Sequence, residues 1–225
     1  MNEERFIEEL KKEGIDLDKE FLKKLKIYKD FLKKKNEETN LTALKTDEDI
    51  YLKHFYDSVI ITKYYDFSKI KSIVDVGTGA GFPGVIIKLM YPDLNVTLLD
   101  SNKKKCNFLV ELMDKLDITE GIEIIRGRAE IVDKKYDAVI GRAVGSISYL
   151  AEISNKLYKK HLILLRGKNE PVSENLFKKL FLKIVDDVKY YLPITNAERR
   201  ILVFKKVRTN TIYPRHTSII KKDPL

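Results

Sequence analysis

Residues 72–84 read SIVDVGTGAGFPG, so a β-branched run leads directly into four closely spaced glycines. Glycine lets the backbone turn sharply and lets a ligand approach the chain closely. An apolar stretch over residues 85–89 follows and predicts a helix. Pro83 is expected at the first position of this helix, where a missing N–H has no consequence. The free N–H groups at the start of the helix would face an anionic group. In open α/β folds such a loop lies at the carboxyl ends of the strands, where ligands bind.

Two cofactors are compatible with this loop. The spacing of its last three glycines fits the dinucleotide fingerprint, and Asp100, after the next apolar run, supplies the acidic residue expected about 20 positions on for a ribose hydroxyl. The glycines begin earlier, however, at Gly77, and Asp75 precedes them. An Asp-x-Gly-x-Gly-x-Gly series resembles the first motif of class I methyltransferases, whose loop wraps S-adenosylmethionine. This order favours a methyltransferase, although Asp100 would bind ribose in either class.

Short β-branched runs alternate with helical stretches from residue 71 onward. This alternation predicts a parallel sheet with right-handed crossovers. Two last runs, 190–192 and 201–204, have no strong helix between them and predict an antiparallel pair at the sheet edge. We therefore expect an α/β fold of the class I Rossmann-like methyltransferase type, mostly parallel, with helices on both faces. The other runs expected to form strands are 73–76, 96–99, 122–125, 138–140 and 162–165.

The first part of the chain has a helical pattern instead. Apolar residues recur at steps of three and four from Phe21 to Leu32, and Asp18 can cap the helix that they predict. A second helix is expected over residues 51–61. We expect residues 1–66 to form an N-terminal helical extension and residues 67–225 to form one compact domain, since 225 residues suffice for one large core.

Composition restricts where the protein acts. Hydrophobic residues make up 44 %, but no run approaches the roughly 18 apolar residues of a membrane-spanning helix. The first thirty residues show no apolar core of a signal peptide. A single cysteine, Cys106, excludes an internal disulfide and suits a reducing compartment. We expect a soluble, cytoplasmic protein that acts as a monomer.

The positive charge is concentrated in the last third. The formal net charge is +9, and residues 151–225 hold 17 Lys and Arg against 7 Asp and Glu, whereas residues 1–150 are nearly balanced. A basic sector beside a neutral one is typical of a protein with a polyanionic partner such as RNA. A lysine-rich surface that only maintains solubility would give the same count.

Several short motifs occur in one order along the chain, and together they resemble the RsmG family, also called GidB. The resemblance covers most of the chain from about residue 36. It implies transfer of a methyl group from S-adenosylmethionine to N7 of a guanine in 16S ribosomal RNA, either as RNA or in the small ribosomal subunit. The motifs are NLTA at 40–43, HFYDS at 54–58, the loop at 75–84, LDS at 99–101, KK at 104–105, FL at 108–109, RAE at 128–130, RAV at 142–144, ERR at 198–200 and YPR at 213–215.

The resemblance and the loop together indicate site residues. In the cofactor pocket we expect Asp75, Gly77, Gly79, Gly81, Phe82, Asp100, Ala129, Glu130 and Arg142. On the basic surface we expect RNA contacts from Arg166, Lys168, Arg199 and Arg215. The family more often has lysine where this chain has Arg166, which presents a planar fork in place of a point charge. Gly141 and Gly145 flank Arg142 where serine and alanine are expected.

The chemistry of guanine N7 explains why no catalytic residue is assigned. N7 carries an exposed lone pair and needs no general base, so alignment supplies most of the catalysis. Methylation of an exocyclic amine usually goes with Asn/Asp-Pro-Pro-aromatic after the fourth strand, where this chain reads GRAV at 141–144. Cys106, the nucleophile that a pyrimidine C5 methyltransferase would need, is better interpreted as a small helix residue. The three histidines are too scattered to predict a metal site.

Three other functions remain open on the residues alone. A methyltransferase of a small molecule or protein would share the cofactor half but would not need the basic sector. A dinucleotide-dependent oxidoreductase is disfavoured by Asp75 and the early Gly77. An RNA-binding protein that has lost activity is disfavoured by the intact loop and Asp100.

Overall fold

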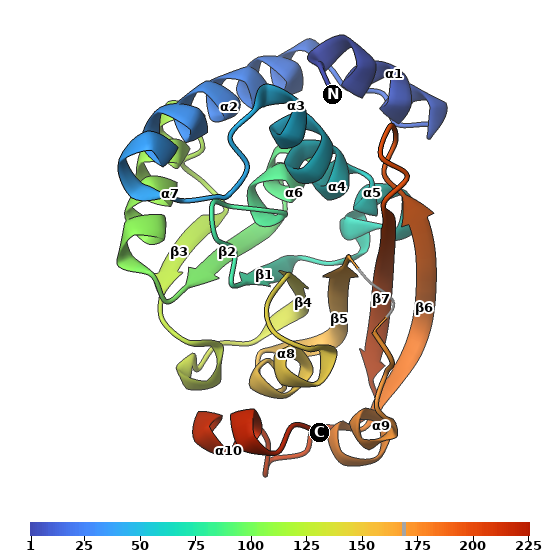
Figure 1. Ribbon diagram of the computed structural model, residues 1–225. Helices are drawn as coiled ribbons and strands as arrows, with labels where there is room; N and C mark the ends of the chain where they lie inside the picture. Colours follow the sequence, from blue (N-terminus) through green and yellow to red (C-terminus); the bar gives the residue numbers. More distant parts are fainter. Residues whose placement is uncertain (168–169) are drawn as a thin grey trace.

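The computed structural model describes residues 1–167 and 170–225. Its centre is a seven-stranded sheet in the order β3-β2-β1-β4-β5-β7-β6 (Figure 1). Strands β1 to β5 pair in parallel, whereas β7 is antiparallel to both β5 and β6. The predicted parallel sheet with an antiparallel edge pair is therefore confirmed. The strands are β1 (Ser72–Val76), β2 (Asn95–Asp100), β3 (Ile122–Arg126), β4 (Tyr136–Arg142), β5 (Tyr158–Arg166), β6 (Leu182–Tyr191) and β7 (Glu198–Lys206).

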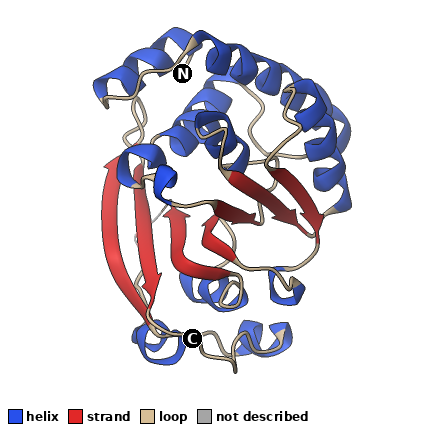
Figure 2. Ribbon diagram, turned by 180° about the vertical axis from the view of Figure 1, so that it is seen from behind, coloured by secondary structure: helices blue, strands red, loops and turns tan. Residues whose placement is uncertain are grey.

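Helices cover both faces of this sheet (Figures 1 and 2). One face carries α1 (Glu3–Lys12), α2 (Lys19–Thr39), α3 (Asp47–Asp49), η1 (Ile50–Tyr56), α4 (Asp57–Val59), α5 (Ile61–Tyr64), η2 (Phe67–Lys69), α6 (Gly84–Met90) and α7 (Lys103–Lys115). The other face carries η3 (Ala129–Ile131), α8 (Ile147–Ile153), α9 (Glu174–Leu180) and α10 (Thr217–Lys222). The helices of each face enclose their own hydrophobic core against the sheet.

The strands supply both cores because successive side chains point to opposite faces. Ile73 belongs to the core under α6 and α7, and its neighbour Val74 belongs to the core under α8. Ala138 and Val139 divide in the same way, and all four side chains are fully buried. A strand buried on both faces is apolar throughout, which is why the runs of β1 and β4 could be identified in the sequence.

The N-terminal extension packs directly on the glycine loop. Asp18 caps α2 as predicted, with its Oδ1 accepting from Phe21 N at 2.7 Å. The Tyr28 ring stacks on Phe82 at 4.9 Å, and the Tyr28 hydroxyl donates to the Ala80 carbonyl. Helix α1, which the sequence analysis did not identify, adds buried Phe6 to the same core. The extension thus shares its hydrophobic core with the sheet.

The second predicted helix has an irregular centre. Residues 47–64 form consecutive helical segments, and η1 in their middle is a seven-residue π-helix. Such segments are rare and frequently occur at functional sites. Asp57 follows directly after this segment and faces the ends of β4, β6 and β7.

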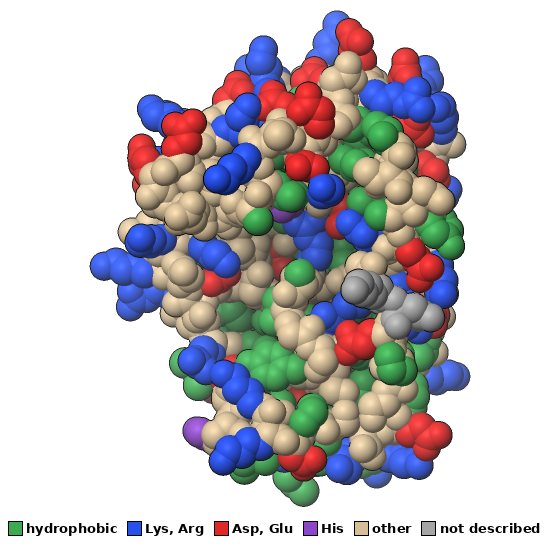
Figure 3. Space-filling view, viewed as in Figure 1, with side chains coloured by type: hydrophobic (Ala, Val, Ile, Leu, Met, Phe, Trp, Pro, Cys, Tyr) green, Lys and Arg blue, Asp and Glu red, His purple; other side chains and the backbone are tan. Residues whose placement is uncertain are grey.

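Figure 3 shows one side of the molecule with its side chains. A hollow lies near the middle of this side, and Lys and Arg side chains with a histidine are visible at its floor. Two adjacent pockets open in this region, at the carboxyl ends of the parallel strands.

Candidate active site

The glycine loop connects β1 to α6 with three left-handed residues. Gly77, Gly79 and Gly81 have φ values of +69°, +63° and +100°, which side chains strongly disfavour. A Cβ atom on Gly77 would lie 2.4 Å from Val144 Cγ2, so this position also lacks space. The N–H of Gly77 donates to Leu99 O at 2.8 Å. The loop is therefore fixed against the end of β2.

Asp75 supports the loop from below. Its carboxylate is fully buried, and Oδ2 accepts from Thr78 Oγ1 at 2.7 Å and from Gly84 N at 2.9 Å. Burial raises the pKa of Asp75 to about 6. Oδ1 is buried without a hydrogen-bond partner among the described residues. Asp75 therefore accepts from the first N–H of α6, which was expected to be free for a ligand. Pro83 was expected at the first position of this helix and lies one residue earlier, at the N-cap.

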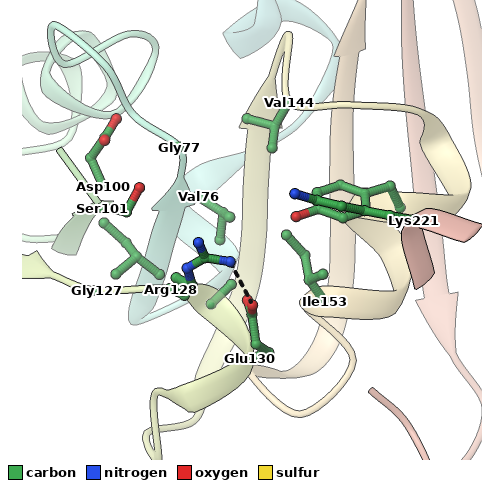
Figure 4. Close-up of a pocket in the computed structure, with 13 residues that line it drawn as sticks. Val76, Gly77, Asp100, Ser101, Gly127, Arg128, Glu130, Val144, Ile153 and Lys221 are labelled. Carbon is green, nitrogen blue, oxygen red and sulfur yellow. Dashed lines mark ion pairs between the residues drawn. The ribbon is translucent and has the colours of Figure 1, made fainter. Parts of the chain in front are cut away.

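Asp100 lies in the first pocket, a cleft of about 240 Å³ that opens beside the loop (Figure 4). Its Oδ2 accepts from Gly79 N at 3.0 Å and its Oδ1 from Asn102 N at 2.8 Å. Because these bonds leave lone pairs on both oxygens, the carboxylate can still accept from a ligand hydroxyl. The side chain is nearly buried, so such a bond would be partly protected from water.

A second carboxylate of this cleft, that of Glu130, lies among apolar and basic side chains. Ala129 and Glu130, from η3, were expected in the cofactor pocket and line this cleft, and Glu130 pairs with Arg128 at 3.8 Å. Thr217 Oγ1 also donates to Glu130, so the C-terminal tail is fixed at the rim. Lining residues that the sequence analysis missed are Val76, Leu99, Ser101, Gly127, Arg128, Val144, Tyr149, Ile153 and Lys221. The last of them comes from α10 and closes one side of the cleft (Figure 4).

Residues 142–145 form the wall between this cleft and a second pocket. Val144 faces the cleft, and Ala143, the residue before it, faces the second pocket. Ala143 has a φ of +57°, a conformation that a non-glycine residue adopts at some cost and often at functional sites. Gly141 precedes the wall because a Cβ there would lie 2.5 Å from Leu150 Cδ2.

Asp57 is the centre of the second pocket, which has a volume of about 530 Å³. Its carboxylate is 5 % exposed and accepts from Tyr190 Oη at 2.7 Å, Arg142 Nη1 at 3.1 Å and Arg199 Nε at 3.2 Å. One side chain from the extension thus holds the ends of β4, β6 and β7 together. The Arg142 side chain, which we expected in the cofactor pocket, lies here on the other side of the wall.

His54 completes the support of Arg142. Its Nδ1 accepts from Arg142 Nη2 at 2.9 Å, since arginine can only donate, so its Nε2 carries the proton and donates to Thr42 Oγ1 at 2.9 Å. Burial and the neighbouring Arg142 lower the pKa of His54 to about 3. Its ring stacks on Phe82 at 4.3 Å, which places the predicted Phe82 under the extension. His54 is therefore a neutral positioning group.

The residues expected to contact RNA do not lie together. Arg166 and Arg199 line the second pocket, whereas Arg215 pairs with fully buried Glu152 at 2.7 Å and with Asp223 at 3.2 Å. The guanidinium of Arg215 therefore connects the tail to α8. Lys168 lies outside the described residues. Lys53, His54, Asp57 and Glu170 also line the pocket and were not predicted there, although HFYDS at 54–58 was among the quoted motifs.

Two kinds of feature are absent from the residues that the structure describes. These residues contain no helix long and apolar enough to cross a membrane. They also contain no group of three His, Cys, Asp or Glu side chains that could hold a metal ion.

Solved methyltransferase structures have the same fold. Magnesium protoporphyrin IX methyltransferase from Synechocystis PCC 6803 with bound SAH aligns with a TM-score of 0.55 at 15 % identity, over 81 % of this chain and 99 % of that chain. A SAM-dependent methyltransferase from Aquifex aeolicus aligns at 0.53 and 15 %, over 75 % and 98 %. Together with the glycine loop and the carboxylate that ends β2, this sheet order defines the fold of the class I methyltransferases.

Sequence relatives then specify the family. The GidB model, described as rRNA small subunit methyltransferase G, matches residues 21–202. Ribosomal RNA small subunit methyltransferase G of Macrococcus caseolyticus is 40 % identical over 237 residues, covering 100 % of this chain and 99 % of the relative. The protein of the same name from Acetivibrio thermocellus is 40 % identical over 224 residues, covering 94 % and 92 %. The chain belongs to the GidB family of ribosomal RNA small subunit methyltransferases.

Proposed function

We propose that this protein transfers the methyl group of S-adenosylmethionine to N7 of a guanine in 16S ribosomal RNA. The observation that carries the proposal is the pair of pockets on either side of residues 142–145, one with ligand-accepting carboxylates and one lined by arginines. Methyl transfer needs this arrangement because donor and acceptor approach the reacting carbon from opposite sides. Membership of the GidB family supports ribosomal RNA as the acceptor.

The residues of the first cleft fit this cofactor. Asp100 would accept from the ribose hydroxyls, and Ala129 and Glu130 would meet the adenine ring. Gly77 lines the cleft and lets the Val144 side chain pack against the loop, where a Cβ would have no space. The unpartnered Oδ1 of Asp75 lies under the loop and would favour a positively charged group above it. These residues bind and orient, and none of them has to transfer a proton.

Methylation of guanine N7 needs no general base, and His54 in the second pocket is not available as one. Bound S-adenosylmethionine supplies a methyl group on a positively charged sulfur. The N7 lone pair forms the carbon–nitrogen bond while the carbon–sulfur bond breaks and its electron pair stays on sulfur. No proton leaves N7, so no general base is needed. His54 is neutral, and both of its ring nitrogens are already hydrogen-bonded.

The surrounding basic surface would bind the RNA backbone. We propose that Arg166 and Arg199 contact RNA at the pocket and that Lys168 extends this contact. For Arg215, the ion pairs with Glu152 and Asp223 favour a structural task. We further propose that the protein acts in the cytoplasm as a monomer.

The test is methylation by the purified protein of two substrates, naked 16S RNA and small ribosomal subunits, both from a strain that lacks this activity. Mass spectrometry of the nucleosides should find 7-methylguanosine in at least one substrate, at one position. RNA binding should weaken steeply with salt, whereas binding of S-adenosylhomocysteine should not. A methyl group on another atom, or none on either substrate, would refute the proposal.

A further inference from the structure

The second pocket contains one cation that the fold leaves incompletely bonded. Arg166 ends β5 and is 8 % exposed, and its Nη1 donates to Gly145 O at 2.7 Å. Its Nε and Nη2 are buried and have no hydrogen-bond partner among the described residues. Buried donors without acceptors are destabilising, and more so when they are charged. A ligand acceptor in this pocket would remove that penalty.

The other cations that line the pocket in the described part of the chain are already paired. Arg142 and Arg199 both bind the Asp57 carboxylate, and Lys53 pairs with Asp49 at 2.6 Å. One carboxylate therefore orients both arginines, and Lys53 has its own acidic partner, before any ligand arrives. Arg166 is the cation with free donors.

One carboxylate faces the same pocket. Glu170 Oε1 accepts from Ile147 N at 2.8 Å, and the Glu170 carbonyl accepts from Arg200 Nη1 at 2.6 Å. In the described part of the chain, Glu170 and Arg166 are thus each held by backbone groups and not by each other. The pocket therefore presents the Glu170 carboxylate as an acceptor and the Arg166 guanidinium as a donor, with neither bonded to the other in the described structure.

We propose that this pair reads the Watson–Crick edge of the target guanine, with Glu170 accepting from N1–H and the N2 amine and Arg166 donating to O6. The inference rests on the proposed function. Guanine presents two donors beside one acceptor on this edge, which complements a carboxylate beside a guanidinium. Adenine presents a bare N1 lone pair there, which Glu170 repels, and a phosphate is repelled by the same carboxylate.

This orientation also leaves the reacting atom free. N7 lies on the Hoogsteen edge, which adjoins the Watson–Crick edge only at O6, so a base held by Glu170 at N1 and N2 keeps its N7 lone pair free. The wall at Ala143 and Val144 separates this pocket from the cofactor cleft by a single peptide unit. Recognition of the Watson–Crick edge and methylation of N7 are therefore compatible in one pose.

The experiment compares Glu170→Gln with Glu174→Gln on small subunits reconstituted with ligated 16S RNA that carries guanine or inosine at the methylated position. Inosine lacks only the N2 amine. With the parent protein, inosine should lower kcat/KM about 10- to 100-fold, the range of one good bidentate base contact. Glu170→Gln should lower kcat/KM on guanine by a similar factor and show little further loss on inosine. Glu174 is 81 % exposed and pairs only within α9 in the described structure, so its variant should behave as the parent.

A second comparison addresses O6. Arg166→Met should lose activity on guanine about 10- to 100-fold, whereas Arg166→Lys, which still offers a charged donor, should retain most of it. Affinity for S-adenosylhomocysteine should be unchanged in all variants. Equal rates of the parent on guanine and inosine would overturn the proposal even if Glu170→Gln did not fold. If the parent forms no 7-methylguanosine at all, the proposed function fails instead.

Discussion

Gly77→Ala and Gly79→Ala add the same methyl group to the same loop, but the structure gives the two methyl groups different surroundings. Both positions have a left-handed φ, near +69° and +63°, and this conformation costs an alanine about 1–2 kcal/mol. At Gly79 the nearest atoms to a new Cβ are 3.9 Å away, an ordinary contact. At Gly77 the new Cβ lies 2.4 Å from Val144 Cγ2, which adds an overpacking cost of about 1–3 kcal/mol. We expect Gly77→Ala to lose about 2–5 kcal/mol and Gly79→Ala about 1–2 kcal/mol.

Urea unfolding of both variants measures this difference, and titration with S-adenosylhomocysteine measures its effect on the cleft. The double variant Gly77→Ala, Val144→Ala is the control, because the new Cβ would then face Val144 Cβ at 3.6 Å. The double variant should lose less free energy of unfolding than the losses of Gly77→Ala and Val144→Ala added together, by about 1–3 kcal/mol. Equal losses at the two glycines, or a coupling below about 0.5 kcal/mol, would refute the steric argument.

Substitutions of three supporting carboxylates, with one control, test the other contacts. Asp57→Asn should lower the free energy of unfolding by about 3 kcal/mol, because two arginines lose a buried partner. The control Asp187→Asn, at a side chain that is 38 % exposed, should lower it by less than about 1 kcal/mol. Equal urea midpoints for the two variants would contradict this prediction. The raised pKa of Asp75, about 6 against 3.8 unfolded, means that the folded state binds more protons between these values. Relative to the parent, Asp75→Asn should therefore gain up to about 3 kcal/mol as pH rises from 4 to 7, and a flat difference would argue against a buried charge. Asp100→Ala should weaken binding of S-adenosylhomocysteine by about 10- to 100-fold through a lost charge-assisted hydrogen bond; calorimetry that finds equal affinity would remove Asp100 from the cofactor site.

The sequence predicted those features that depend on neighbours in the chain or on strand register. Gly77 had to begin a turn because it follows a buried strand and lacks a side chain. Parallel pairing of Val76 with Leu99 then brings Asp100 to the loop, where it binds Gly79 N. These positions follow from periodicity and from the common direction of β1 and β2.

The sequence did not predict which charges pair across the fold. Asp57 and Tyr190 are 133 positions apart, and no local pattern indicates that their side chains meet. Arg142 was assigned to the cofactor pocket from the resemblance to the family, yet the left-handed residue after it and the bonds to Asp57 and His54 keep its side chain in the second pocket. Arg215 was expected to contact RNA, but its guanidinium pairs with buried Glu152, 63 positions away.

These long-range pairs give the N-terminal extension a part in building the acceptor pocket. Asp57 and His54 come from the extension, and both bind Arg142, the first residue of the wall between the two pockets. Tyr28 and Phe82 connect the same extension to the glycine loop on the other side of that wall. A displacement of the extension would therefore release the wall and the loop together. Because methyl transfer requires the nucleophile and the methyl carbon to be aligned across the wall, substitutions deep in the extension should reduce the rate of methylation more than the affinity for either ligand alone.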